Sequence, residues 1–362
     1  MNERLYTLIR TLAEKHSISI DDYRYILDNY CIEAADLLRE LAVKARKKIY
    51  DNSVFVRGLI EISNFCKNDC FYCGIRRSNK NCSRYRLSSD QIIECAEDGY
   101  KLGFRTFVLQ GGEDAYFTDE ILCDLITKLK EKYSDCAVTL SLGERGRESY
   151  LRLYNAGADR YLLRHETAMK NHYEKLHPSE MSFQNRMNCL YTLRDIGYQT
   201  GCGFMVGSPF QTNEALAQDL KFIETFKPDM CGIGPFIPHN STPFAAEKVG
   251  SLETTCYLLS IIRLIYPSVL LPSTTALGTI HQRGREEGIL AGANVVMPNL
   301  SPFSVRGKYE LYDNKLCTGE ESAQCLNELC DRMRAIGYKV VIDRGDIKKS
   351  EGKRNLLQRK EK

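Results

Sequence analysis

The sequence predicts an α/β protein: a parallel (β/α)8 barrel of the TIM type, with a helical N-terminal lead-in and a C-terminal extension. From Val54 to about position 300, short β-branched or apolar runs alternate with longer amphipathic runs. Strands that alternate with helices pair in parallel through right-handed crossovers. Eight such units favour closure into a barrel, and a doubly wound open sheet is the alternative topology.

The eight strand-like runs are VRGLIEIS, RTFVLQ, AVTLSL, RYLLR, TGCGFMV, MCGIGPF, VLLPST and ANVVMP. Helix ends between them are recognisable. Ser88 and Gln91 predict a capping box, and Gly103 and Gly197 stand where left-handed C-caps are expected. In a parallel barrel, chemistry collects at the carboxyl ends of the strands. The polar loops that follow the runs are therefore the place to look for a site.

Composition divides the chain into four segments. Apolar residues at three-to-four spacing, such as Leu5, Leu8 and Leu12, predict helices before the first strand. The predicted segments are 1–50, a helical N-terminal segment; 51–305, the barrel; 306–345, a C-terminal loop and a helix near 321–336; and 346–362, a basic tail expected to be disordered.

The chain has 362 residues, a net charge of +3 and 27% charged residues, so no global basicity suggests a nucleic-acid partner. Charged residues interrupt the first 22 positions, which fits neither a signal peptide nor a membrane span. We therefore expect a cytoplasmic protein. Its 15 cysteines should then be buried thiols or metal ligands rather than disulfides.

Three of these cysteines, Cys66, Cys70 and Cys73, share the loop SNFCKNDCFYCGIRR after the first strand. A structural zinc ion takes four protein ligands, and no second pair of cysteines stands in this region. Three thiolates suit a 4Fe-4S cluster that leaves one iron open. The amino and carboxylate groups of S-adenosylmethionine could chelate that iron. A non-catalytic iron-sulfur carrier is the alternative, and it would ignore S-adenosylmethionine.

The CxxxCxxC spacing, with Tyr72 just before the last cysteine, resembles the radical S-adenosylmethionine superfamily. Gly111, Gly112 and Glu113 follow the second strand, where that superfamily has a GGE-like motif whose backbone binds the methionine ammonium. The resemblance implies reductive cleavage of S-adenosylmethionine to methionine and a 5'-deoxyadenosyl radical. In such chemistry the protein supplies orientation and exclusion of water.

Longer runs narrow the resemblance. CKNDCFYCGIRRSNKN, VLQGGED, GADRYLLRHETA, GIGPFIPH and TTALGTI, between about Val54 and Tyr312, resemble the HydE family of FeFe-hydrogenase maturases. Methylornithine synthase and biotin synthase are related by motif, and RHETA and GPFIPH favour HydE over both. A mutase like methylornithine synthase is the alternative enzyme.

The resemblance also implies a substrate and partners. The substrate would be a small organometallic or anionic species, an iron carbonyl-cyanide bound to cysteine, whose sulfur the radical attacks. HydG would deliver it, HydF would be the scaffold for H-cluster assembly, and a ferredoxin or flavodoxin would donate electrons. Beyond the cluster and cofactor, no catalytic residue is assigned.

By the same resemblance, Glu166, Arg186 and Met205 would line the S-adenosylmethionine site. An ion pair with Arg164 is the alternative reading of Glu166. A deeper anionic-substrate cavity would be lined by Arg57, Arg160, Thr274, Thr275 and Tyr309. Both arginines lie in otherwise apolar strands, and a buried charge needs a partner or a ligand. Pairing with a barrel carboxylate such as Glu61 is the alternative reading of the arginines.

Many members of the family have a second cluster site near the C-terminus, spaced CxxxxxxxCxxC. Cys317 and Cys325 fit this spacing, but position 328 is Glu. Cys330 comes two residues late, which on a helix turns it about 200 degrees from the expected face. An auxiliary 2Fe-2S cluster is therefore expected to be incomplete.

Overall fold

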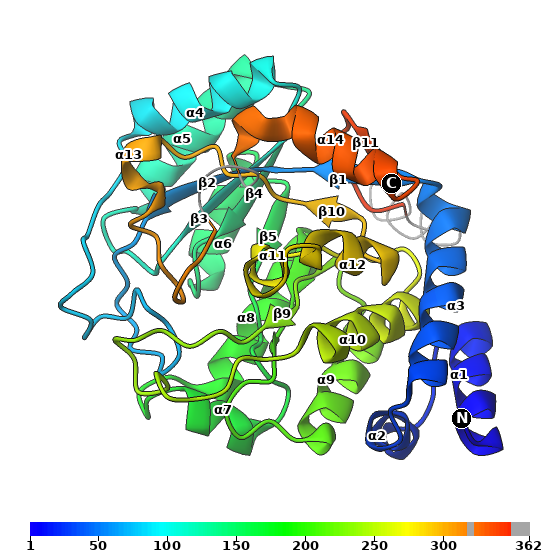
Figure 1. Cartoon of the computed structure of the whole chain (residues 1–362). Helices are drawn as coiled ribbons and strands as arrows, with labels where there is room; N and C mark the ends of the chain where they lie inside the picture. Colours follow the sequence, from blue (N-terminus) through cyan, green and yellow to red (C-terminus); the bar gives the residue numbers. More distant parts are fainter. Residues whose placement is uncertain (317–321, 349–362) are drawn as a thin grey trace, which may run out of the picture.

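Figure 1 shows the computed structural model of the chain, which describes residues 1–316 and 322–348. Three helices come first: α1 (Glu3–Lys15), α2 (Ile20–Asp28) and α3 (Ile32–Tyr50). The side chains of Asn2 and Ser19 cap α1 and α2 by accepting backbone N–H groups of their first turns. The apolar faces pack on the outside of the main body, with α3 against α10 (Leu252–Ile265) and α2 against α9 (Asn213–Phe226).

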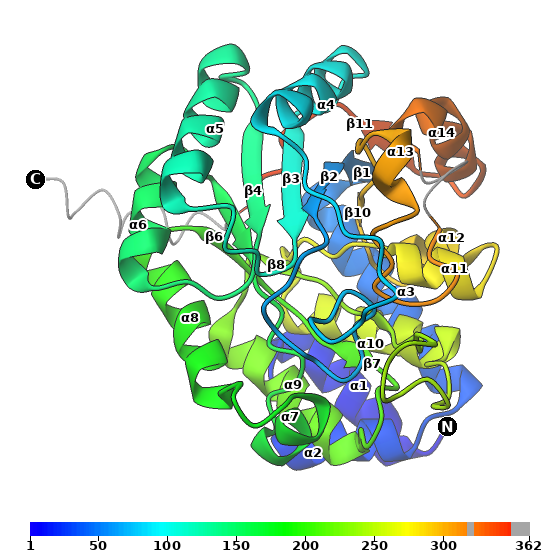
Figure 2. The ribbon, with the colours of Figure 1, turned by 90° about the vertical axis from the view of Figure 1, so that its left-hand side faces the viewer.

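The centre of the molecule is a parallel sheet of six strands in the order β2-β3-β4-β5-β6-β8. Helices separate successive strands, as the sequence predicts. Figure 2 shows four of them along the outer side of the sheet: α4 (Ser89–Lys101), α5 (Asp119–Lys132), α6 (Arg147–Asn155) and α8 (Phe183–Ile196). The strands are β2 (Gly58–Ser63), β3 (Thr106–Gly111), β4 (Ala137–Ser141), β5 (Arg160–Leu162), β6 (Gln199–Cys202) and β8 (Met230–Cys231).

Single parallel bridges extend the pairing beyond both edges of this sheet. Met230 of β8 pairs with Leu270, and at the other edge Leu59 of β2 pairs with Asn299. Between them, Pro272 pairs with Val295. In the described residues no continuous ladder of full strands closes the barrel. The parallel β/α fold is confirmed, while the predicted seventh strand, VLLPST, is reduced to isolated bridges.

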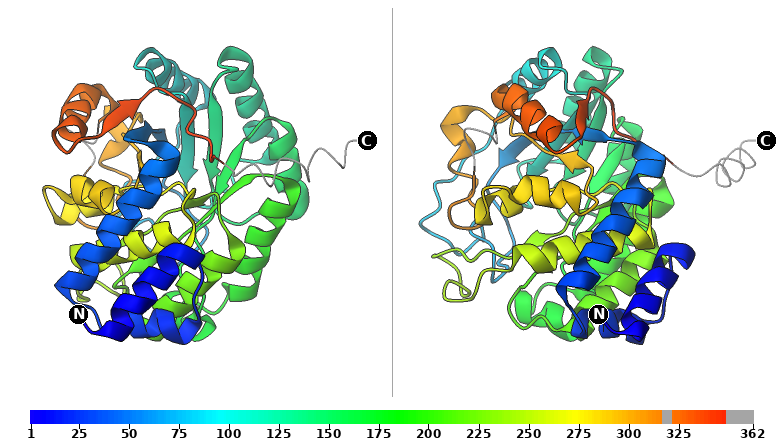
Figure 3. Two further views of the ribbon diagram at one scale, coloured as in Figure 1. Left: turned by 90° about the vertical axis from the view of Figure 1, so that its right-hand side faces the viewer. Right: turned by 45° about the vertical axis from the view of Figure 1, so that its right-hand side comes forward.

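The predicted first strand is wrong in one respect, because it breaks at Arg57 into two. β1 (Ser53–Val56) leaves the main sheet and pairs in parallel with β10 (Val295–Val296) and β11 (Lys339–Val341). The sequence analysis did not predict β11. Its pairing with β1 ties the C-terminal extension to the start of the barrel, as Figure 3 shows for the segment in red.

The predicted helix signals are confirmed. Ser88 and Gln91 form the capping box of α4, and Gly197 ends α8 in the left-handed conformation with φ 114°. Gly103 follows α4 with φ 97°. The remaining elements are α7 (Lys170–Leu176), β7 (Met205–Val206), β9 (Gly234–Pro235), α11 (Thr275–Ile280), α12 (Gly284–Leu290), α13 (Phe303–Arg306), the 3-10 turn η2 (Ala323–Cys325) and α14 (Leu326–Ala335).

The C-terminal segment after β11 runs to Lys348 in the described structure. Asp346 and Ile347, inside the segment expected to be a tail, pack against the body of the protein. Residues 349–362, the rest of that expected tail, lie outside the described residues, as does Cys317. Within the described chain, every helix is too short or too polar to cross a bilayer.

Candidate active site

The three thiols of Cys66, Cys70 and Cys73 lie on the loop that follows β2, at the carboxyl end of the sheet. All three line one cavity of about 340 Å³, which is also bordered by residues of β2, β3, β4 and β5. The cavity also collects residues from the ends of the other strands, including Glu113 after β3 and Glu166 after β5. The site thus forms where a parallel β/α fold places its chemistry.

Arginines hold the loop in shape through its own polar groups. Arg76 donates two hydrogen bonds to Asp69, at 2.8 and 2.7 Å. Arg84 donates to the carbonyl oxygens of Ile75 and Arg76, at 2.8 and 2.6 Å. Bidentate and charge-assisted hydrogen bonds are the strong ones, so these contacts fix the shape of the loop.

The GGE motif packs directly against the cysteine loop. The backbone N–H of Glu113 donates to Sγ of Cys66 at 3.4 Å. A Cβ atom on Gly112 would lie 2.2 Å from the carbonyl oxygen of Phe65, so only glycine allows this approach. Gly111 ends β3 and pairs with Ser63 of β2. The motif therefore fixes the position of the first cysteine.

Burial makes the three thiols harder to deprotonate. Burial raises the pKa of Cys70 to about 12, and it also raises the pKa of Cys66 and of Cys73. Neighbouring thiols contribute, since Cys70 and Cys66 both raise the pKa of Cys73. Metal binding must therefore displace protons from these side chains.

Within the described chain, no three His, Cys, Asp or Glu side chains converge on a single-ion site. A 4Fe-4S cluster instead spreads its thiolates over separate irons. Three thiols that border one cavity, without converging on a point, fit such a cluster.

On one wall of the cavity, polar atoms are buried without hydrogen-bond partners. Glu166 follows β5 with φ 65°, and its Oε2 atom lies 3.2 Å from Nη2 of Arg164. The geometry of this ion pair is not that of a hydrogen bond, and both atoms are otherwise unsatisfied in the described structure. Buried groups of this kind are costly unless a ligand binds them. They suit the amino-acid and ribose groups of S-adenosylmethionine.

Arg186 stands beside them and is held in place. Its Nε donates to Oε1 of Glu144 at 2.5 Å, and its Nη1 donates to the carbonyl oxygen of Arg164 at 2.7 Å. Met205 of β7 lines the same cavity. The structure therefore brings Glu166, Arg186 and Met205 together with Tyr72, as the sequence analysis expected for a cofactor site.

A histidine that the sequence analysis did not identify orients Tyr72. The Tyr72 hydroxyl lies 3.1 Å from Nε2 of His177, and Nδ1 of His177 lies 2.9 Å from the carbonyl oxygen of Tyr173. Nδ1 must donate to that carbonyl, so Nε2 accepts from Tyr72. Burial, aided by Arg186, lowers the pKa of His177 to about 3. The ring is therefore neutral at physiological pH.

The cavity also contains a buried ion pair that the sequence analysis missed. Nζ of Lys315 lies 2.6 Å from Oε1 of Glu61, and both residues line the cavity. Tyr309, Thr274 and Thr275 also line the cavity, and Oγ1 of Thr274 has no hydrogen-bond partner in the described residues. Lys315 stands 254 residues from Glu61 on a loop without periodicity, so no local signal marks the pair.

The structure does not bring Arg57 and Arg160 to this cavity, which corrects the expected substrate site. Both lie at the N-terminal ends of strands, opposite the cysteine loop. Nη2 of Arg160 pairs with Oδ1 of Asp346 at 2.5 Å, and Nη2 of Arg57 donates to the carbonyl oxygen of Gly345 at 3.5 Å. Asp346 and Gly345 belong to the C-terminal segment, which therefore covers this end of the sheet.

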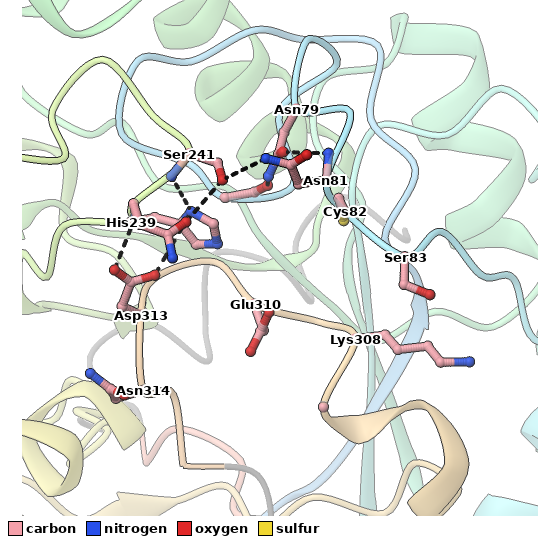
Figure 4. Close-up of a pocket in the computed structure, with 13 residues that line it drawn as sticks. Asn79, Asn81, Cys82, Ser83, His239, Ser241, Lys308, Glu310, Asp313 and Asn314 are labelled. Carbon is pink, nitrogen blue, oxygen red and sulfur yellow. Dashed lines mark hydrogen bonds and ion pairs between the residues drawn. The ribbon is translucent and has the colours of Figure 1, made fainter.

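A second pocket, of about 540 Å³, lies outside the cysteine loop (Figure 4). Residues 307–315 separate the two spaces. Tyr309 and Lys315 face the inner cavity, while Glu310 and Asp313 line the outer pocket together with His239 and Cys82. A single layer of chain is thus the partition between the outer pocket and the inner cavity.

Comparison with known proteins agrees with this geometry. The family model described as "Radical SAM superfamily" matches residues 60–223. The [FeFe] hydrogenase maturase subunit HydE of Thermotoga maritima is 44% identical over 87% of this chain and 89% of its own. The 3-methylornithine synthase of Methanosarcina acetivorans is 29% identical over 90% and 91%.

Among solved structures, the crystal structure of methylornithine synthase (PylB) is similar with a TM-score of 0.81 and 26% identity, covering 92% of this chain and 97% of that one. The match to the HydE sequence spans both the cysteine loop and the strands that build the cavity. The chain therefore belongs to the HydE family of radical S-adenosylmethionine enzymes.

Proposed function

We propose that this enzyme acts in FeFe-hydrogenase maturation, on a cysteine-bound iron carbonyl-cyanide precursor of the H-cluster. The observation that supports it best is the position of the cysteine loop at the edge of a cavity of about 340 Å³ in a chain 44% identical to HydE. When bound, a 4Fe-4S cluster and S-adenosylmethionine supply reductive cleavage and a 5'-deoxyadenosyl radical, which we propose attacks the cysteine sulfur of the substrate.

The chain's own residues have three tasks in this proposal. Cys66, Cys70 and Cys73 hold the cluster through three thiolates. Arg164 and Glu166, with their unsatisfied buried atoms, bind polar groups of S-adenosylmethionine. The GGE backbone and Tyr72 orient that cofactor, and Tyr309, Thr274 and Thr275 line the substrate side. The apolar residues of the cavity, such as Leu59, Leu162 and Met297, reduce the water around a reactive radical.

Partners follow from the proposed function. HydG would supply the precursor, HydF would receive the product, and a ferredoxin or flavodoxin would reduce the cluster.

We place the enzyme in the cytoplasm, because the described cysteines are free thiols, which suits a reducing compartment. We also infer the four-segment division at 50, 305 and 345. An auxiliary 2Fe-2S cluster is not part of the proposal, since α14 has Glu328 where a third cysteine is needed.

In vitro maturation tests the proposal. Reconstituted enzyme, S-adenosylmethionine and reductant are added with HydG and HydF to an immature FeFe-hydrogenase, and hydrogen evolution is measured. We expect activity that depends on this enzyme and disappears with the Cys70→Ser variant. Full cleavage of S-adenosylmethionine without any gain of hydrogenase activity would contradict the maturation role.

A carbon-skeleton mutase is the second candidate, because the similarity to the methylornithine synthase structure covers 92% of this chain. The two functions differ in substrate. Feeding L-lysine and analysing products by mass spectrometry separates them, since only a mutase would form 3-methylornithine. We expect none.

A further inference from the structure

We propose that Lys315 is a specificity-determining residue of the inner cavity: its ammonium group binds a carboxylate of the substrate, and Glu61 holds it in place until the substrate arrives. The inference rests on the proposed function, since it assumes a cysteine-bearing substrate. It identifies the substrate group that the protein recognises, a carboxylate, and the residue that binds it.

The charge distribution of the cavity leads to Lys315. Three cations line the cavity in the described chain: Arg164, Arg186 and Lys315. Arg186 is committed to Glu144, and Arg164 faces Glu166, both on the cofactor wall. Arg57 and Arg160, the cations expected to bind an anion, lie at the other end of the strands. Lys315, which lies beside Tyr309, is thus the cavity cation outside these two pairs in the described chain.

The surroundings of Lys315 would allow its ammonium group to move from Glu61 to a ligand. Its side chain is 7% exposed, and its Nζ lies 2.6 Å from Oε1 of Glu61, whose side chain is fully buried. The other carboxylate oxygen of Glu61, Oε2, accepts a hydrogen bond from Nδ2 of Asn299 at 2.9 Å. Glu61 therefore keeps a partner when the ammonium group turns toward a ligand. An ammonium has three N–H donors, so it can also bind Glu61 and a carboxylate together.

Two further groups of the cavity support a ligand there. Oγ1 of Thr274 lines the same cavity and lacks a hydrogen-bond partner in the described structure. The ring of Tyr309 lies with its centroid 5.2 Å from Nζ of Lys315, which steadies the cation without neutralising it. A cation and a free hydroxyl on a largely apolar wall are the usual means of fixing a small ligand by one polar end.

The test compares L-cysteine with cysteamine, which has the thiol and amine but no carboxylate. Both are titrated calorimetrically into reconstituted enzyme loaded with S-adenosylmethionine. We expect the wild type to prefer L-cysteine, and Lys315→Met to weaken L-cysteine binding at least about tenfold, as for the loss of a charge-assisted bond. Cysteamine binding should change little. Lys315→Arg should keep the preference, and Glu61→Gln should strengthen it by freeing the ammonium.

Two further variants control for folding and for general effects of charge. The double variant Glu61→Gln/Lys315→Met removes both charges, so it avoids an unpaired buried carboxylate and should also lose the preference. Lys101→Met removes the lysine of an exposed ion pair with Glu97, and this variant should keep the preference for L-cysteine. The inference is overturned if the double variant still prefers L-cysteine, or if the wild type never did. Absence of S-adenosylmethionine cleavage by the wild type would instead overturn the proposed function, because the titration does not depend on turnover.

Discussion

Single side chains decide whether the cavity can hold a cluster and its cofactor. The spacing of Cys66, Cys70 and Cys73 is a local pattern, so the sequence alone predicts the cluster ligands. The Tyr72 contact with His177 joins residues 105 apart, and the Glu61 contact with Lys315 joins residues 254 apart. Nothing near these residues in the chain marks such pairs. They become visible only when the fold brings their loops together.

The first prediction concerns the cysteines. Cys70→Ser should abolish cluster retention and S-adenosylmethionine cleavage, because a cluster with two thiolate ligands is poorly held. Cys325→Ser should leave cleavage intact, since Cys325 lies at the start of α14 and does not line the cavity. Iron content and 5'-deoxyadenosine yield measure both. Loss of cleavage in Cys325→Ser would show that the C-terminal thiols serve the reaction.

The second prediction concerns His177. His177→Leu should lower the free energy of unfolding by about 1–3 kcal/mol, because the buried Tyr72 hydroxyl loses its acceptor. His177→Gln keeps an acceptor and should cost less. S-adenosylmethionine should bind more weakly to the Leu variant than to the Gln variant. Equal affinity in both would mean that the hydrogen bond does not orient Tyr72. Urea unfolding and calorimetry supply the two measurements.

The same histidine predicts a pH dependence. Its folded pKa of about 3 is below the ordinary value of 6.5, so the unfolded chain binds the extra proton between these values. Stability should therefore fall as the pH drops from about 6.5 toward 3. His177→Gln cannot take up this proton, so the wild type should lose stability relative to it over that window. A stability difference that stays constant with pH would contradict a neutral, buried ring.

Loops and strand ends show which elements the sequence specifies and which it does not. The capping box at Ser88 and the left-handed Gly197 are local signals, and both are found where predicted. The break at Arg57 and the pairing of β11 with β1 depend on contacts between distant segments. For the same reason the partner of Arg160 was not foreseen. Asp346 belongs to a segment that reads as a solvated tail by composition.

The close approach of the GGE loop to the cysteine loop gives a third prediction. Gly112→Ala should reduce cluster content and raise the KM for S-adenosylmethionine, because the added Cβ would meet the backbone oxygen of Phe65 at 2.2 Å. Backbone cannot move aside as a flexible side chain does. Gly307→Ala is the matched control, since a Cβ there meets nothing within 4 Å. If both variants retain full cluster content, the packing of the two loops is not required.

The C-terminal segment gives a fourth prediction. Asp346→Asn should lower the free energy of unfolding by about 1–3 kcal/mol, because it removes the anionic partner of the buried Arg160. The figure is below that of a fully buried pair, since the Asp346 side chain is 40% exposed. Thermal unfolding monitored by circular dichroism measures it. A variant as stable as the wild type would show that the segment does not secure this end of the sheet.

At the scale of the whole molecule, alternation of strands and helices predicts the parallel fold, and the observed six-stranded sheet agrees. Closure of the sheet into a barrel is harder to predict from the sequence. Two-residue strands such as β10 and the single bridges at Leu270 and Pro272 have too few residues to form a recognisable pattern. The parallel fold is nevertheless sufficient to bring the carboxyl ends of the six strands of the sheet to one edge. The cysteine loop, the GGE motif and the RHETA segment meet there as a consequence.

The central claim is that three thiolates hold a cluster with one iron open to S-adenosylmethionine. Electron paramagnetic resonance of the anaerobically reconstituted, dithionite-reduced enzyme tests it most directly, with 5'-deoxyadenosine measured in the same samples. We predict a 4Fe-4S signal that shifts when S-adenosylmethionine is added, followed by formation of 5'-deoxyadenosine. A signal indifferent to the cofactor, as from a cluster with four thiolates, or a tetrahedral zinc ion in its place, would contradict the account.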